Sequence, residues 1–275
     1  MENALKVTKA EASIISLIGR LPILSYYSNS RGWSFLISWG HRLAGLMLVG
    51  YIFAHIYMLS LLFNPAAFDA NMRFLDHFVF AFLEWCIAIP VIFHSLNGGR
   101  LILYELFHVR EEEIAIRSLV GLGFIYAAIV GFFFLKESPQ ISATLFWSIA
   151  VAISLLAFFV VIFKVWMTRN SLLWKLQRIT GAFMLPMLIG HMLFMHMNYL
   201  AGHDSKTIIL RMQSPFIKGI DFVFIVFLLF HAGHGLFSII ADYIKPGPLI
   251  KSLTLLIVIV MAISVFFGIR LVLAL

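Results

Sequence analysis

Seven apolar stretches, each long enough to cross a bilayer as a helix, constrain the fold of this chain more than any other feature. A hydrocarbon core of about 30 Å requires about 20 apolar residues in an α-helix. Short polar segments separate the stretches, which lie near residues 34–63, 77–106, 117–135, 143–167, 173–199, 217–244 and 250–274. Backbone polar groups in lipid must be paired within their own segment, so the sequence predicts an all-α integral membrane protein with about seven transmembrane helices.

The composition of the 275-residue chain supports this fold class and excludes several functions. Hydrophobic residues make up 62% of the chain and charged residues only 12%, which is more apolar than a soluble core requires. Cys86 is the only cysteine, so the chain has no disulfide framework and cannot by itself ligate an iron–sulfur cluster. The net charge of +7 is concentrated at the ends of the stretches, where membrane topology explains it. We therefore expect membrane lipid as a partner, and no nucleic acid.

The basic residues predict the orientation of the chain in the membrane. With the N-terminus inside, fourteen Lys and Arg residues lie on or near the inner side and six lie outside. The positive-inside rule therefore favours a multi-pass protein of the inner (cytoplasmic) membrane, with its N-terminus inside and its C-terminus outside. Residues 12–19 form a short apolar run that Arg20 closes. We interpret residues 1–33 as an N-terminal inner-face segment with an interfacial helix.

Two halves of the chain carry matching motifs. The first half reads His41-Arg42-Leu-Ala-Gly45, then His55, and later Phe93-His94-x-x-x-Gly98. The second half reads Gln177-Arg178-Ile-Thr-Gly181, then His191, and later Phe230-His231-x-x-x-Gly235. In both halves thirteen residues separate the arginine from the next histidine, and an acidic residue (Glu105 or Asp242) follows the last histidine by eleven.

These matches predict two three-helix repeats, residues 34–136 and 173–275. Both repeats would begin on the inner side, and a three-helix unit that begins inside ends outside. Fusing two such units in parallel therefore requires one extra crossing. We interpret residues 143–167, which contain no histidine, as this linker transmembrane helix.

Histidines inside apolar helices are candidate axial ligands for haem b. Ligation by two histidines leaves no coordination position open and suits electron transfer, and helix bundles build cofactor sites between facing helices. The internal symmetry pairs His94 with His231 and His55 with His191, in a four-helix bundle of helices 1, 2, 5 and 6. At about 1.5 Å per residue the first pair lies nearer the inner side by roughly 10 Å.

The sequence thus predicts two haem b groups, an inner and an outer one. It predicts a single group if His55 and His191 do not bind haem iron. The alternative is that the histidines bond neighbouring helices or relay protons without a metal.

Charged residues at matching positions extend this pattern. Arg42 and Arg178 stand at the inner ends of the first and fifth stretches and are candidate partners for haem propionates, unless they are ordinary snorkelling arginines. Glu84 and Asp221 each precede a histidine of the inner pair by ten residues and lie near the outer ends of their helices. Ionisable groups within membrane segments are usually functional, so we expect an outer quinone or proton site there. The alternative is that both carboxylates face lipid headgroups.

A family resemblance rests on the same motifs. Ser38-x-x-His41-Arg42-x-x-Gly45, with His94-x-x-x-Gly98-x-Arg100 on the next helix, resembles the larger cytochrome b anchor polypeptide of succinate dehydrogenase and fumarate reductase (succinate:quinone oxidoreductase, respiratory complex II). Gln177-Arg178-x-Thr180 and the stretch from His231 to Asp242-Tyr243 resemble the smaller anchor polypeptide. The resemblance covers most of the first, second, fifth and sixth stretches, whereas the fourth has no counterpart. The chain resembles a fusion of both polypeptides.

The resemblance implies a function and further site residues. It implies a quinone site formed by Ser38, Arg42 and Tyr243 with Asp242 beside it, and it implies that His41 and Arg178 attend haem propionates. His55 and His191 resemble the dihaem branch of the family, which implies menaquinone as the quinone.

The implied partners are a flavoprotein subunit and an iron–sulfur subunit. These carry the succinate or fumarate chemistry of the tricarboxylic acid cycle, for which we expect no catalytic residue in this chain. We expect docking surfaces for them within Leu5–Arg31 and Val109–Arg117.

Two other functions compete with this one. A cytochrome b subunit of a hydrogenase or formate dehydrogenase also has histidine-bearing helices, but it is not expected to carry Asp242-Tyr243. A haem-free transporter with an internal repeat is the third reading. The sequence leaves open the direction of the reaction, its coupling to proton movement, and the oligomeric state, including a higher oligomer of the complex.

Overall fold

The computed structural model describes residues 33–108, 112–134, 143–196 and 202–275. The chain forms two compact units, residues 1–43 and residues 44–275, which divide within the first described helix. Of the expected N-terminal segment at residues 1–33, with its interfacial helix and its docking surface at Leu5–Arg31, all but Trp33 lies outside the described residues.

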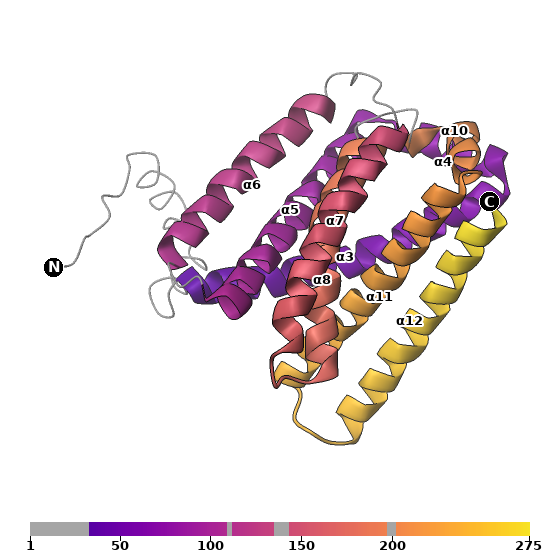
Figure 1. Ribbon diagram of the computed structural model, residues 1–275. Coiled ribbons are helices and arrows are strands. Elements are labelled where there is room, and N and C mark those ends of the chain that lie inside the picture. The colour runs from indigo at the N-terminus through magenta and orange to yellow at the C-terminus, as the bar shows by residue number, and fades with distance from the viewer. Residues whose placement is uncertain (1–32, 109–111, 135–142, 197–201) are drawn as a thin grey trace. The chain divides into compact units, whose positions relative to one another are not determined.

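Seven long helices correspond to the seven apolar stretches, and none of the described residues forms a strand. They are α3 (Trp33–Ser60), α5 (Phe78–Phe107), α6 (Glu112–Phe134), α7 (Ala143–Trp166), α8 (Leu172–His191), α11 (Pro215–Tyr243) and α12 (Pro248–Ala274) (Figure 1). Within the described ranges, six of them are long and apolar enough to cross a membrane, and α6 contributes the shorter apolar stretch Ile114–Val130. The prediction of an all-α integral membrane protein is confirmed.

Local sequence signals explain where these helices begin and end. Proline stands in the first turn of α11 and of α12, where its missing N–H has no helical partner to lose. The Ser171 hydroxyl caps α8 by accepting a hydrogen bond from the Trp174 main-chain N–H (3.3 Å). At the end of α5, His108 takes the left-handed conformation (φ 57°), which terminates the helix. Helix α8 is regular only to His191 and continues as one π-helical turn, η2 (Met192–His196).

Two of the polar segments between the apolar stretches contain short helices. A 3₁₀ turn, η1 (Leu61–Phe63), leads into α4 (Pro65–Leu75), and α10 (Ser205–Met212) precedes α11. Asn64 caps α4 by accepting from the Ala67 N–H (3.3 Å). Asp204 caps α10 by accepting from the Thr207 hydroxyl (2.6 Å) and from the Thr207 N–H (2.8 Å), and these hydrogen bonds hold the pKa of its carboxyl below the ordinary value.

The helices α4 and α10, which we call the cap, are bound to each other. The main-chain N–H and the hydroxyl of Ser205 both donate to the Asp69 carboxylate, at 3.1 and 2.9 Å. Phe68, Ile208 and Met212 are buried beneath this contact. The cap thus joins the segment between α3 and α5 to the segment between α8 and α11, and it lies at the same end of the second unit as the C-terminus (Figure 1).

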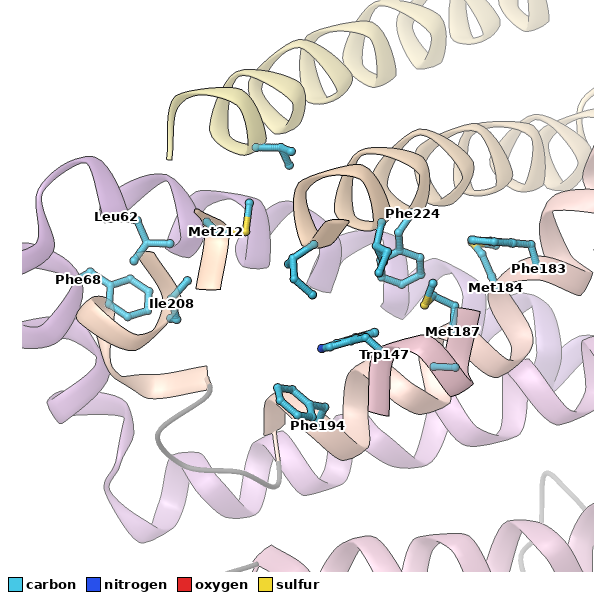
Figure 2. Packing of buried hydrophobic residues seen from close by; sticks show 14 residues of the cluster. Leu62, Phe68, Trp147, Phe183, Met184, Met187, Phe194, Ile208, Met212 and Phe224 are labelled. Carbon is cyan, nitrogen blue, oxygen red and sulfur yellow. The ribbon is translucent and has the colours of Figure 1, made fainter. Parts of the chain in front are cut away.

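Helix α8 is the centre of the second unit. It packs along α7 and also contacts α5 and α11, while α6 packs on α5 and α12 on α11. A cluster of buried apolar side chains extends from Phe68, Ile208 and Met212 of the cap to Phe183 and Met184 on α8 (Figure 2). The order α3, α5, α6 before α7 matches the order α8, α11, α12 after it, and the division into two repeats and a linker stays a prediction.

Two histidine pairs and a cavity as the candidate functional site

Two pairs of histidines face each other between the helices of the second unit. His94 on α5 and His231 on α11 have ring centroids 6.4 Å apart and ring planes at 83°. His55 on α3 and His191 on α8 have centroids 5.9 Å apart and planes at 82°. The structure therefore brings together the pairs that the internal symmetry specifies, although their role as iron ligands stays a prediction.

The spacing of both pairs fits a metal held between two imidazoles. A metal–nitrogen bond of about 2 Å on each side, added to the ring radii, separates the two centroids by about 6 Å. Among the described residues there is no group of three or more His, Cys, Asp or Glu side chains that could hold a metal ion. Haem b needs only two axial histidines from the protein, because the porphyrin supplies the other ligands. The donor set therefore fits haem b.

A glycine of each half packs against the histidine of the same half. A Cβ atom on Gly45 would lie 3.1 Å from Cε1 of His94, and a Cβ on Gly181 would lie 3.2 Å from Cε1 of His231. Both distances are shorter than ordinary van der Waals contact, so a larger side chain at either position requires the imidazole to shift. The sequence reasoning gave these glycines no role, although the shared Arg-x-x-Gly motif was the signal that could have revealed them.

The tautomer of His231 follows from its neighbours. Its Nδ1 atom lies 3.4 Å from Oγ1 of Thr180, and that hydroxyl donates its single hydrogen to main-chain carbonyls, chiefly that of Leu176 (2.8 Å). Thr180 can therefore only accept from His231. This assigns the proton to Nδ1 and leaves Nε2 as the metal-binding nitrogen, as is usual for histidine ligands.

Arg178 forms an ion pair between α8 and α5. Its Nε and Nη2 atoms donate to the two oxygens of Glu105 at 2.8 and 2.7 Å, and its guanidinium lies over the ring of Trp174, 4.3 Å from the centroid. Bidentate pairing of this kind fixes the guanidinium geometrically. The role of Arg178 beside a haem propionate stays a prediction. In this structure the guanidinium of Arg178 is already paired with the Glu105 carboxylate.

A cavity of about 590 Å³ lies on the cap side of the second unit and contains the other predicted residues. Its wall includes His55, His191, Glu84 and Asp221, together with apolar side chains from the surrounding helices and the cap. The volume lies within the range of about 300–1,000 Å³ typical of ligand pockets. The structure therefore places both carboxylates of the expected outer site in one cavity with the second histidine pair.

Several further polar residues of this cavity, among them Tyr51 and Arg211, were given no role by the sequence reasoning. The ring of Tyr51 stacks on His55, with centroids 5.6 Å apart. Arg211 of α10 reaches the wall from the cap and donates to Sδ of Met195 (2.7 Å), a weak acceptor. Burial lowers the pKa of Arg211, and the charge of Asp221 partly offsets this.

The residues expected to bind quinone are divided between the two units. Ser38, His41 and Arg42 lie on the first turns of α3, in the unit of residues 1–43. Asp242 and Tyr243 form the C-terminal end of α11, in the unit of residues 44–275, and both side chains are exposed. The quinone site stays a prediction from the family motif.

These features define a multi-pass integral membrane protein with pairs of facing histidines between its helices. The chain belongs to the succinate dehydrogenase/fumarate reductase transmembrane subunit family, whose sequence profile matches residues 22–133 and 164–271. The two matched stretches cover most of the two expected repeats, and the gap between them contains most of α7. The family resemblance stated from the motifs is confirmed.

One relative gives a more specific comparison. Over 89 residues the chain is 28% identical to the succinate dehydrogenase 2 membrane subunit SdhC of Mycobacterium tuberculosis. The alignment covers 32% of this chain and 63% of that protein, so the chain spans less than two thirds of the relative's length. No solved structure matches the chain significantly.

Proposed function

We propose that the chain is the dihaem cytochrome b membrane anchor of a succinate dehydrogenase or fumarate reductase, with the larger and smaller anchor polypeptides fused through α7. It would dock the flavoprotein and iron–sulfur subunits and pass electrons between their last cluster, haem b and membrane quinone. One observation carries this proposal. The chain belongs to this family and has two histidine pairs whose separation suits a metal. Each pair joins a helix before α7 to a helix after it.

The histidines would hold the two haem groups, His94 with His231 at the inner site and His55 with His191 at the outer one. Bound in this way, haem b supplies a one-electron iron couple without an open coordination position. Gly45 and Gly181 keep space for the imidazoles of the inner pair, and Thr180 orients His231 by accepting from Nδ1. The side chains proposed to bind the propionates are His41, Arg42 and Arg178.

The quinone site would combine residues from α3 and from the end of α11 on the inner side. The Tyr243 hydroxyl would donate to a quinone carbonyl, with Asp242 beside it and Ser38 and Arg42 completing the site. Menaquinone is the proposed quinone. The proposed orientation has the N-terminus inside, so that the soluble subunits dock on the inner face near Val109–Arg117.

Haem content tests the proposal directly. The purified protein is expected to show a b-type band in a reduced-minus-oxidised optical spectrum and to contain two haem b groups per chain. One group per chain would contradict the dihaem assignment. Absence of the band would contradict this function and every cytochrome alternative, and would leave the haem-free transporter.

The two carboxylates of the cavity are proposed to exchange protons with quinol on the outer side. Glu84 and Asp221 share one cavity wall, and general acid–base groups contribute about 10²–10⁴-fold to a rate. We expect Glu84→Gln and Asp221→Asn to lower quinone turnover and proton release at least about tenfold. Asp204→Asn at the start of α10 is the control, because Asp204 is not part of the cavity wall and asparagine can keep its capping role. Turnover and proton release that equal those of this control would contradict the role.

A further inference from the structure

Trp147 of α7 presents a buried hydrogen-bond donor without a partner. Its side chain is only 4% exposed, and its indole Nε1 has no hydrogen-bond partner among the described residues. Buried indole N–H groups normally have a partner, because leaving the donor unpaired costs free energy. The rings of Phe146 and Phe194, each with its centroid 5.6 Å from that of Trp147, hold the indole in place. The donor therefore has a fixed direction.

The unpaired donor belongs to the wall of the cavity that contains His55 and His191. Figure 2 shows the indole nitrogen of Trp147 turned toward the side on which Ile208 and Met212 of α10 lie. Arg211, the residue before Met212, lines the same cavity. It is the only lysine or arginine among the described residues of this wall. An indole N–H from α7 and a guanidinium from the cap thus line one mostly apolar cavity, which also contains the carboxylates of Glu84 and Asp221.

The chemistry of these two donors specifies what they can bind. The indole N–H of Trp147 donates and cannot accept, and it has no acceptor among the described residues, so an oxygen of a ligand would pair it. Arg211 already donates to Met195 and lies near the charge of Asp221, and it adds a positive charge to the same wall. An apolar cavity of about 590 Å³ with a few polar groups is typical of cofactor sites. Carboxylate and quinone carbonyl oxygens are the acceptors carried by the two cofactors of the proposed function.

We propose that Trp147 is a binding residue that donates a hydrogen bond to an oxygen of the ligand in this cavity, either a propionate of the outer haem or a carbonyl of a quinone, and that the positive charge of Arg211 on the same wall favours that oxygen. This inference rests on the proposed function for the identity of the ligand. It assigns a binding role to α7, most of which lies outside the stretches that match the family. The linker helix thereby contributes to the site as well as connecting the two halves.

The experiment compares Trp147→Phe and Arg211→Gln with two matched controls in the purified complex. Trp166→Phe changes an exposed tryptophan of the same helix, and Lys206→Gln removes an exposed charge from α10. Three quantities are measured: the midpoint potential of each haem by optical titration, the Kd of 2,3-dimethyl-1,4-naphthoquinone by equilibrium dialysis, and the Tm.

The two sources of the oxygen give different results. If a propionate is the acceptor, loss of a donor leaves more negative charge beside the iron and favours the oxidised state. The potential of one haem then falls, by about 59 mV for a tenfold shift of a one-electron couple, and the other haem is unchanged. If a quinone carbonyl is the acceptor, both potentials hold and the Kd rises about tenfold, as expected for the loss of one hydrogen bond to a charged or well-placed donor. Either result supports the proposal.

A purely structural role for Trp147 gives a third result, which overturns the proposal. Both variants would then match their controls in potential and in Kd, and Trp147→Phe would change only the Tm. If Trp147→Phe fails to fold, the haem potentials and the Kd of Arg211→Gln still test the proposal. Failure of the proposed function is distinguishable, because the unsubstituted complex would then lack the b-type band.

Discussion

Replacement of His231 by alanine is expected to remove one of two haem b groups and to leave the other in place. The substitution deletes one of the two side chains whose rings face each other at 6.4 Å between α5 and α11. The second pair, between α3 and α8, shares no residue with the first, so its ligands remain. Haem content should fall from two groups per chain to one, measured by pyridine haemochrome and by the reduced-minus-oxidised spectrum.

Two matched variants make this result specific. His191→Ala should also remove one haem, and the remaining spectrum should differ from that of His231→Ala because a different group is retained. His234→Ala changes a histidine one turn away on α11, whose ring stacks on Phe230 instead of facing a second histidine (centroids 6.1 Å apart). This variant should keep both haems. Loss of haem in His234→Ala together with full haem content in His231→Ala would refute the assignment.

Replacement of Gly181 by valine is expected to remove the same haem without touching a ligand. The new Cβ would stand 3.2 Å from Cε1 of His231, and the two methyl groups of valine add further volume. The imidazole would have to move away from its position beside Thr180, and overpacking of this kind costs about 1–3 kcal/mol. We expect haem content to approach one group per chain and the spectrum to resemble that of His231→Ala.

The glycine of the other half should behave in the same way. Gly45→Val places its Cβ 3.1 Å from Cε1 of His94 and is expected to reproduce the loss. Gly50→Val is the control, since a Cβ at this position of α3 has no atom within 4 Å. If Gly50→Val lost as much haem as Gly45→Val and Gly181→Val, the effect would come from valine in a membrane helix, and the proposed packing against the histidines would be wrong.

The sequence was sufficient to predict the long helices and the histidine pairing, for a physical reason. A membrane-spanning helix must be apolar over about 20 residues, so α3, α5, α7, α11 and α12 begin and end within a few residues of the expected limits. The internal repeat then relates each histidine to an equivalent one on another helix. Pairing by symmetry needs no knowledge of how each helix is rotated about its axis. It correctly paired His94 with His231 and His55 with His191.

Features that depend on helix rotation or on weak local signals could not be predicted. The ion pair of Arg178 with Glu105 requires that α8 and α5 present particular faces to each other, which a run of apolar residues does not specify. The cap consists of short helices whose hydrogen bond between Ser205 and Asp69 joins residues far apart in sequence. Trp147 is one aromatic residue among many, and only its unpaired indole nitrogen distinguishes it.

Placement of the two histidine pairs across α7 has a consequence for assembly. Each pair takes one histidine from a helix before α7 and one from a helix after it. On two separate polypeptides such pairs would form only by association in the membrane, and their formation would depend on dilution and on equal synthesis of both partners. A covalent connection makes the step intramolecular, with an effective concentration that is on the order of millimolar for short linkers. Because both halves belong to one chain, they are always present in equal numbers. Neither half can accumulate alone with only one histidine of each pair.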